Sequence, residues 1–346
     1  MILSSNKELR LHVPSNAFDD VSLLQGILDN SEKDFLRDKL GTPLYNRLCE
    51  YYKLNIDADN FYLAVTNGTY AQHPWQELLL NAQRMIANDT LSRYAYQQLI
   101  SANGAGVNMA ASQDYSVATD KMLDKGVQGF KKEAMVSLNN LLLLLEGWAK
   151  LTQPMPIDDT ATDTTTPKDD STEQPSAPTE DERMAEIEEI VHLWQQSEYY
   201  YLHHDLLIPT CAILQQYIDI YANRDKFIRL IPDLRFIQDE YITDVLGEET
   251  LSVLLHADDE QSQRLLRKVR RLMVAYLEER TTVLTIDKSR RQQAHNESIS
   301  LRTSIQSMLK AKQEAEQAKA EMAPDDNKGF ENNQPGSKIF VPPMLY

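Results

Sequence analysis

The sequence has few cysteines, no long apolar run and no signal-like start. Its two cysteines among 346 residues, Cys49 and Cys211, lie far apart. This excludes a disulfide framework and a zinc module. Apolar runs such as Leu141 to Leu145 are far shorter than the roughly 20 residues that cross a bilayer. The segment from Met1 to Lys7 lacks the basic and apolar stretches of a signal peptide. We therefore expect no membrane-spanning segment.

Positive charge is also scarce. The chain has 35 Lys and Arg residues against 52 Asp and Glu residues, which gives a formal net charge of −17. A protein that coats nucleic acid or an anionic membrane needs a basic surface, so both classes are disfavoured. Hydrophobic residues make up 42% of the chain, which is typical of a globular protein with apolar cores. The length is sufficient for two domains.

No catalytic, cofactor or metal motif stands out. The segment from Gly104 to Gly106 lacks the third glycine of a nucleotide-binding loop, so we interpret it as a plain loop. His203 and His204 are adjacent, and on a helix they would point about 100° apart, which is unsuited to one metal ion. We expect no cofactor, no metal and no enzymatic activity. An active site assembled from scattered residues, such as these histidines and Cys211, stays as a further hypothesis.

A strongly acidic segment divides the chain. Residues 151–184 contain nine acidic and two basic residues, several threonines and prolines, and almost no large apolar side chain. Such a stretch cannot bury enough surface to offset the entropy of ordering it. We predict a disordered, flexible linker over residues 153–183, between a helical module at 1–152 and a second helical module at 184–288.

Both modules have the periodicity of helices. Ser5 and Glu8 form a capping-box pattern at a helix start. Gly41 is suited to ending a helix in a left-handed conformation, while Thr42 and Pro43 suit the N-cap and first position of the next helix. No convincing run of alternating strand residues is present. We therefore predict an all-α fold.

Part of the first module recurs in the second. Residues 34–41 align without gaps on residues 240–247, so that Gly41 matches Gly247 at an offset of 206. At the same offset Leu24 matches Leu230, and Leu28 matches Leu234. The pattern favours a divergent duplication of one helical module. A chance agreement between two helix–glycine–helix junctions is the alternative.

The C-terminal region differs from both modules. Residues 289–323 are rich in Gln, Glu, Lys and Ala and predict a long exposed helix with a thin apolar stripe. Residues 324–346 predict an extended tail that is polar until its last part. The apolar end of this tail is expected to dock on its own domain or on a neighbouring subunit. Its candidate interaction residues are Ile339, Phe340, Val341, Leu345 and Tyr346.

One basic cluster interrupts the acidic surface. Arg264, Arg267, Lys268 and Arg271 are neighbours at helical spacing, after acidic residues typical of a helix start. A solvated helix face explains the cluster. Contact with an acidic partner surface or with passing nucleic acid is the functional alternative, so these four residues are further candidates for interaction.

Three parts of the sequence resemble a family of proteins from Bacteroides-type phages and prophages: the segment from Leu9 to Pro14, the segment from Asp34 to Leu36, and Leu40-Gly41. Its members look like head–tail connector proteins, also called head-completion or adaptor proteins. The likeness is best over residues 1–150 and weaker over 225–280. Its motifs are structural, so no active site is carried over from it.

The resemblance implies a noncatalytic virion protein, a neck-ring subunit that joins portal to tail after assembly in the host cytoplasm. Its partners would be portal, tail or other neck proteins and further copies of itself, with incidental proximity to DNA and no membrane contact. The alternative is a bacterial cytoplasmic helical adaptor that tethers two protein partners.

Overall fold

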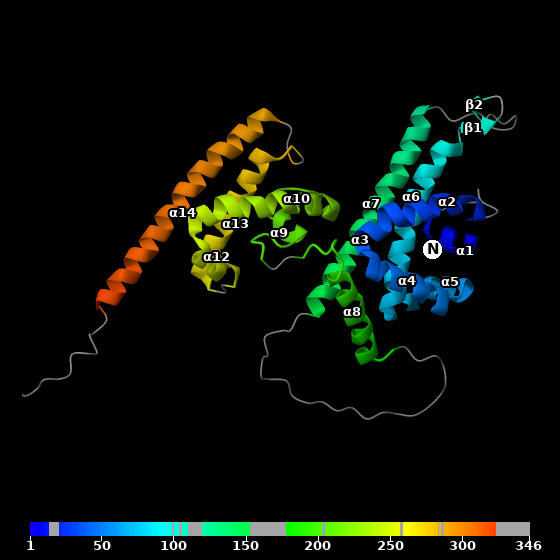
Figure 1. Cartoon of the computed structure of the whole chain (residues 1–346), viewed down its shortest axis with the longest axis horizontal. Helices are drawn as coiled ribbons and strands as arrows, with labels where there is room; N and C mark the ends of the chain where they lie inside the picture. The colour runs from blue at the N-terminus through cyan, green and yellow to red at the C-terminus, as the bar shows by residue number, and fades with distance from the viewer. Residues whose placement is uncertain are drawn as a thin grey trace, which may run out of the picture. The chain divides into compact units, whose positions relative to one another are not determined.

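The structure, a computed structural model, confirms the all-α fold class (Figure 1). It describes residues 1–13, 21–98, 100–103, 106–109, 120–152, 178–202, 205–256, 259–282, 284 and 287–322. One antiparallel pair of strands, β1 (Ile100–Asn103) and β2 (Gly106–Met109), is the exception to the helical pattern. Strands of four residues are too short to show an alternating pattern in the sequence, which is why none was predicted.

The described chain forms two compact units. The first comprises residues 1–202 and 223–228, and the second comprises residues 203–222 and 229–346. Helix α10 (Arg224–Ile237) contributes its start to the first unit and its remainder to the second. The division therefore lies C-terminal to the predicted boundary at residue 184.

The first unit packs several helices around a long pair, α6 and α7, which lie side by side (Figure 1). Trp75 and Ile86 of α6 and Leu138 and Leu145 of α7 are buried. The elements of this unit are α1 (Asn6–His12), η1 (Val21–Leu24), α2 (Gln25–Ser31), η2 (Glu32–Arg37), α3 (Asp38–Leu40), α4 (Thr42–Asn55), α5 (Ala58–Asn67), η3 (Thr69–Gln72), α6 (Pro74–Gln98), β1, β2, α7 (Asp120–Leu151) and α8 (Glu180–Gln195).

Helix α8 corrects the predicted linker and the predicted start of the second module. Thr179 caps the helix in a capping box with Glu182, so residues 180–183 are helical. Acidic residues are favoured at a helix N-terminus as well as in solvated linkers, so the acidic composition of residues 180–182 does not distinguish the two. Ile187 and Trp194 are buried, and α8 packs against α4, α6 and α7 of the first unit. The rest of the predicted linker, residues 153–177, lies outside the described residues.

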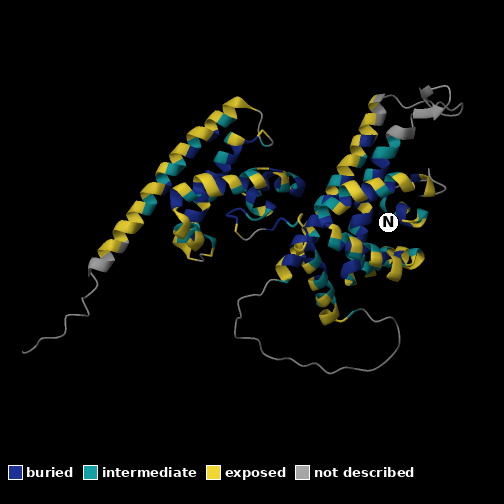
Figure 2. Cartoon of the chain, viewed as in Figure 1, coloured by how far each residue is buried: buried dark blue, intermediate teal, exposed yellow. Residues whose placement is uncertain are grey.

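The second unit is also built on a long helix pair, α13 and α14. Helix α14 is the long C-terminal helix predicted for 289–323. Ala294, Ser298 and Ile305 are its buried residues, and exposed side chains follow most of its length (Figure 2). The elements are α9 (Cys211–Gln215), the remainder of α10, η4 (Gln238–Ile242), α11 (Thr243–Leu246), α12 (Glu248–Leu255), α13 (Glu260–Arg280) and α14 (Lys288–Met322).

The aligned helix junctions have the same backbone geometry in both units. In each, a π-helix (η2 or η4) runs into a short α-helix that ends at a glycine. Gly41 has φ 78° and ψ 158°, and Gly247 has φ 78° and ψ 153°. Both glycines serve as the N-cap of the next helix, so Thr42 is not the cap that the sequence suggested. Pro43, which the sequence suggested for the first position of the helix, is its second residue and lies in the first turn of α4.

The start of each unit follows one plan as well. Ser5 caps α1 and Thr210 caps α9, and each side chain accepts the backbone N–H of the residue three positions on. A buried aliphatic pair precedes each cap, Ile2 with Leu3 and Leu207 with Ile208. The capping box predicted at Ser5 is confirmed. The two units therefore share more local structure than the aligned residues indicated.

Candidate functional site

The predicted basic cluster lies on one helix, α13, but only part of it lines a cavity. Arg267, Lys268 and Arg271 line a groove of about 600 Å³ between α13 and α14. Arg264 does not line this groove. It is exposed and pairs with Glu260 of its own helix at 2.9 Å. The structure thus brings three of the four candidates together.

Ion pairs cross this basic groove from α13 to α14. Arg271 Nε donates to Glu297 Oε1 at 2.7 Å, and Arg290 Nη2 donates to Glu278 Oε2 at 2.8 Å. Lys268 Nζ donates to Ser304 Oγ at 2.9 Å. Exposed ion pairs contribute at most about 1 kcal/mol each to stability. Each pair is weak, but all three join α13 to α14. We therefore interpret the groove mainly as part of the contact between these two helices.

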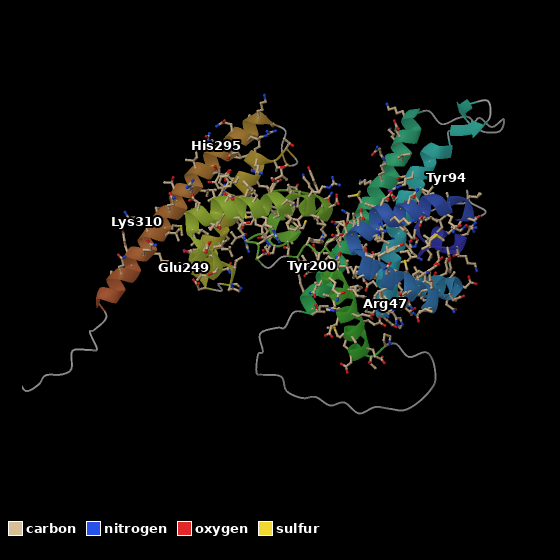
Figure 3. The ribbon with its side chains drawn as sticks, in the orientation of Figure 1. Arg47, Tyr94, Tyr200, Glu249, His295 and Lys310 are labelled. Atoms are coloured by element: carbon tan, nitrogen blue, oxygen red, sulfur yellow. The ribbon has the colours of Figure 1, made fainter. Side chains whose placement is uncertain are left out.

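A second groove on the same unit is lined by aromatic side chains. Tyr241 of η4 and Tyr276 of α13 stack with ring centroids 4.9 Å apart and an interplanar angle of 24°. Together with Ile299 of α14 they line a groove of about 610 Å³, which we call the aromatic groove. His295, which projects from α14 (Figure 3), lies at its rim with Nδ1 2.9 Å from Glu279 Oε1. No local sequence pattern indicates this groove, because its lining residues come from three elements that are separate in the sequence, η4, α13 and α14.

The first unit contains a buried polar cluster that the sequence did not reveal. Glu8 and Glu32 have no exposed surface. Glu32 Oε1 accepts the backbone N–H of Ile2 at 2.8 Å, and its Oε2 accepts Tyr45 Oη at 2.8 Å and lies 3.3 Å from the Met1 amino group. Gln83 donates to Ile2 O at 2.6 Å. The first extended residues are thereby fixed against three helices.

Glu8 is engaged in the same way. Its Oε2 accepts the backbone N–H groups of Ser4 and Ser5 at 3.1 and 3.0 Å and the hydroxyl of Tyr52 at 2.9 Å. Gln83 Nε2 reaches its Oε1 at 3.0 Å. The carboxylate oxygens of Glu8 and Glu32 all accept hydrogen bonds from backbone or side-chain donors. We therefore interpret both side chains as anchors of the backbone and not as groups that act on a substrate.

Burial also sets the protonation of the groups around these anchors. Desolvation, with the hydrogen bond and charge of Glu32, raises the pKa of Tyr45. Desolvation raises the pKa of Tyr52 as well, and lowers the pKa of His12 to about 4. The two phenols and the imidazole are therefore neutral at pH 7. Perturbed groups often mark active sites, but here they surround a backbone segment.

In the second unit a neutral residue performs the corresponding task. Gln238 lies 206 residues after Glu32 and is also buried at a π-helix. Its Oε1 accepts the N–H of Leu207 at 2.8 Å, and its Nε2 donates to Asp205 O at 2.8 Å. The two units thus share the anchoring hydrogen bond but not the charge.

A buried ion pair forms a second polar network in the first unit. Arg224 Nη2 lies 3.0 Å from Glu146 Oε2, and the side chains are 7% and 3% exposed. Tyr201 Oη donates to the other Glu146 oxygen at 2.7 Å. The backbone N–H of Arg224 donates to Asn139 Oδ1 at 3.0 Å. These contacts fix the start of α10 on α7, and no local sequence pattern could indicate a pair 78 residues apart.

The predicted helix junctions occupy different surroundings. A Cβ placed on Gly41 would overlap the side chain of Ser197, whereas a Cβ on Gly247 would meet nothing within 4 Å. Gly41 is therefore required for a close approach as well as for its backbone angles. Its counterpart is required for the angles alone.

The remaining candidates are not brought together. Ile339, Phe340, Val341, Leu345 and Tyr346 lie outside the described residues, as do His203 and His204. Cys211 is buried at the start of α9. Within the described ranges, no group of three His, Cys, Asp or Glu residues is placed to hold a metal ion, and no helix is long and apolar enough to cross a bilayer.

Comparison with family models, with curated proteins and with solved structures gives no match for this chain. Inference about its function therefore depends on the contacts above and on the motifs in its own sequence.

Proposed function

We propose that the chain is a noncatalytic structural protein of a phage or prophage virion, a head–tail connector that forms a neck ring between portal and tail. Two lines support the proposal. One is the likeness of its N-terminal motifs to connector proteins. The other is a pair of helical units whose shared features are all structural.

The observation that carries the proposal is the comparison between Glu32 and Gln238. Both side chains are buried at a π-helix and both bind the backbone of an upstream segment. Together with the matching angles of Gly41 and Gly247, this supports duplication of one module. What the two copies share is the scaffold, while the buried carboxylate of Glu32 is replaced by the amide of Gln238. The features that recur in the two units are helix junctions and backbone anchors, which hold structure in place. Such features suit a protein that assembles with other proteins.

A ring between portal and tail requires contacts with portal, tail or other neck proteins and with further copies of the chain. A net charge of −17 suits a subunit close to a DNA channel, because an acidic wall repels phosphate and lets DNA move. The proposed location is the virion, after assembly in the host cytoplasm.

The test is the mass of the purified chain, alone and mixed with the portal protein of the same phage or prophage, by native mass spectrometry. We expect a closed oligomer or a defined complex with the portal oligomer. A portal protein from an unrelated phage is the control. A monomer that ignores the portal would contradict the connector role, and one that captures two unrelated host proteins would favour the adaptor.

A further inference from the structure

The aromatic groove exposes apolar side chains among charged ones. Tyr241 is 40% exposed and Ile299 is 55% exposed, and both side chains line the groove. Arg280, Arg302 and Glu279 stand around the groove. An apolar floor with a polar rim is the arrangement of a docking site for a polypeptide segment.

The aromatic surface extends beyond the tyrosine pair to Phe236 of α10, whose ring stands edge-on to Tyr241 with an interplanar angle of 70°. Phe236 is 39% exposed, and its ring centroid lies 5.9 Å from that of Tyr241. The guanidinium of Arg280 lies 3.9 Å from the Phe236 centroid, which fixes the ring at one end. Rows of aromatic rings bind proline-containing segments, because the proline rings pack flat on them and the extended backbone is already ordered.

The chain itself contains a segment with this chemistry. Residues Ile339 to Tyr346 read Ile-Phe-Val-Pro-Pro-Met-Leu-Tyr and contain no charged side chain. The two prolines favour an extended conformation and lower the entropy lost on docking. Large apolar side chains flank the prolines on both sides, so the segment can cover both the tyrosines and Ile299.

The segment can reach the groove within one molecule. Thr303, at the groove, lies 19 residues before the end of α14 at Met322, or about 29 Å along the helix axis. Residues 323–338 connect the helix to the apolar segment and can span up to about 53 Å when extended. The return path is therefore shorter than the connecting chain.

We propose that the aromatic groove binds the segment from Ile339 to Tyr346 of the same chain. A tethered segment is present at its groove at an effective concentration on the order of millimolar, so in dilute solution it outcompetes the segment of a second copy. Docking in this way covers the Tyr241–Tyr276 pair and Ile299. This inference does not depend on the virion role.

The test is photo-crosslinking in the full chain, with Ile299→p-benzoylphenylalanine as the probe. Val253 is 57% exposed on α12 and does not line the groove, so Val253→p-benzoylphenylalanine is the matched control. After irradiation and digestion, mass spectrometry should find residues 339–346 linked to position 299 and not to position 253. Both probes replace exposed side chains, so neither should disturb folding.

A mixture of ¹⁴N and ¹⁵N protein separates the two sources of the segment. At about 10 micromolar protein we expect links within one molecule to exceed mixed-isotope links by about a hundredfold. The double variant Phe340→Ser and Leu345→Ser should reduce the yield of the crosslink to position 299 about tenfold or more, because two apolar side chains that would be buried in the groove are removed. Equal links from 253 and 299, no link from 299, or mainly mixed-isotope links would overturn the proposal.

Discussion

Replacing Gly41 with alanine tests the closest packing in the first unit. Gly41 has φ 78° and ψ 158°, a conformation that costs other residues about 1–3 kcal/mol. The new Cβ would also overlap the Ser197 side chain, and overpacking of this kind costs about 1–3 kcal/mol. We expect Gly41→Ala to lower the free energy of unfolding of the first unit by about 2–6 kcal/mol.

Gly247→Ala is the matched control, because its backbone angles are nearly the same and its Cβ would meet nothing within 4 Å. It should cost only the backbone strain, about 1–3 kcal/mol. Ser197→Gly removes the atoms that overlap, so in the Gly41→Ala background it should restore the second part of the loss. The double-mutant cycle should give a coupling of about 1–3 kcal/mol.

The assay is urea unfolding followed by two signals. All three tryptophans, Trp75, Trp148 and Trp194, belong to the first unit, so tryptophan fluorescence reports its unfolding. Circular dichroism reports both units. Two results would refute the close packing of Ser197 against Gly41. One is an equal loss of unfolding free energy in Gly41→Ala and Gly247→Ala, and the other is the absence of coupling between Gly41→Ala and Ser197→Gly.

Three further changes probe the buried polar groups, each measured by urea unfolding with tryptophan fluorescence. Glu146→Gln removes the negative charge that lies against the buried Arg224 guanidinium and should cost about 3–5 kcal/mol; a loss below about 1 kcal/mol would show that the pair is hydrated. His12 has its pKa lowered by burial from 6.5 to about 4, so the unfolded chain takes up this proton first as the pH falls. The contribution of neutral His12 to the free energy of unfolding is complete above pH 6.5, and about 3 kcal/mol of it is lost between pH 6.5 and 4. His12→Gln should therefore flatten the dependence of stability on pH in this range. An unchanged dependence would contradict the burial of His12. Glu32→Gln keeps an acceptor for the Ile2 N–H, as in the second unit, whereas Glu32→Ala leaves it unpaired, so the alanine variant should be less stable by a further 1–3 kcal/mol or so; equal stability would argue against the anchor.

Local signals in the sequence were sufficient for several of the helix ends. The capping box at Ser5 and the glycine junctions at Gly41 and Gly247 depend on a few neighbouring residues, and the structure has each of them. The apolar residues at helical spacing in α6 and α7 are buried. These features follow from backbone geometry and hydrophobic periodicity, which short windows of sequence contain.

Features that depend on distant residues could not be predicted. Helix α8 has acidic residues in its first turn, and these are typical both of linkers and of helix starts. Its assignment to the first unit follows from the burial of Ile187 and Trp194 against helices far away in sequence. The pairs of Glu146 with Arg224 and of Glu32 with Ile2 join segments 78 and 30 residues apart.

The candidate site was predicted in part for the same reason. Helical spacing placed Arg267, Lys268 and Arg271 on neighbouring turns, and the structure puts all three in one groove. Their partners Glu297 and Ser304 belong to α14, so the sequence did not indicate that the charges are shared between helices. The aromatic groove required the packing of η4, α13 and α14 and had no local pattern.

The most direct test of the proposed virion role is deletion of the coding sequence from the genome that contains it, followed by electron microscopy of any virus particles that the strain releases on induction. A neck connector predicts DNA-filled or leaking heads without attached tails, restored by the intact chain supplied in trans. Normal tailed, infectious particles from the deletion strain would contradict the proposed function.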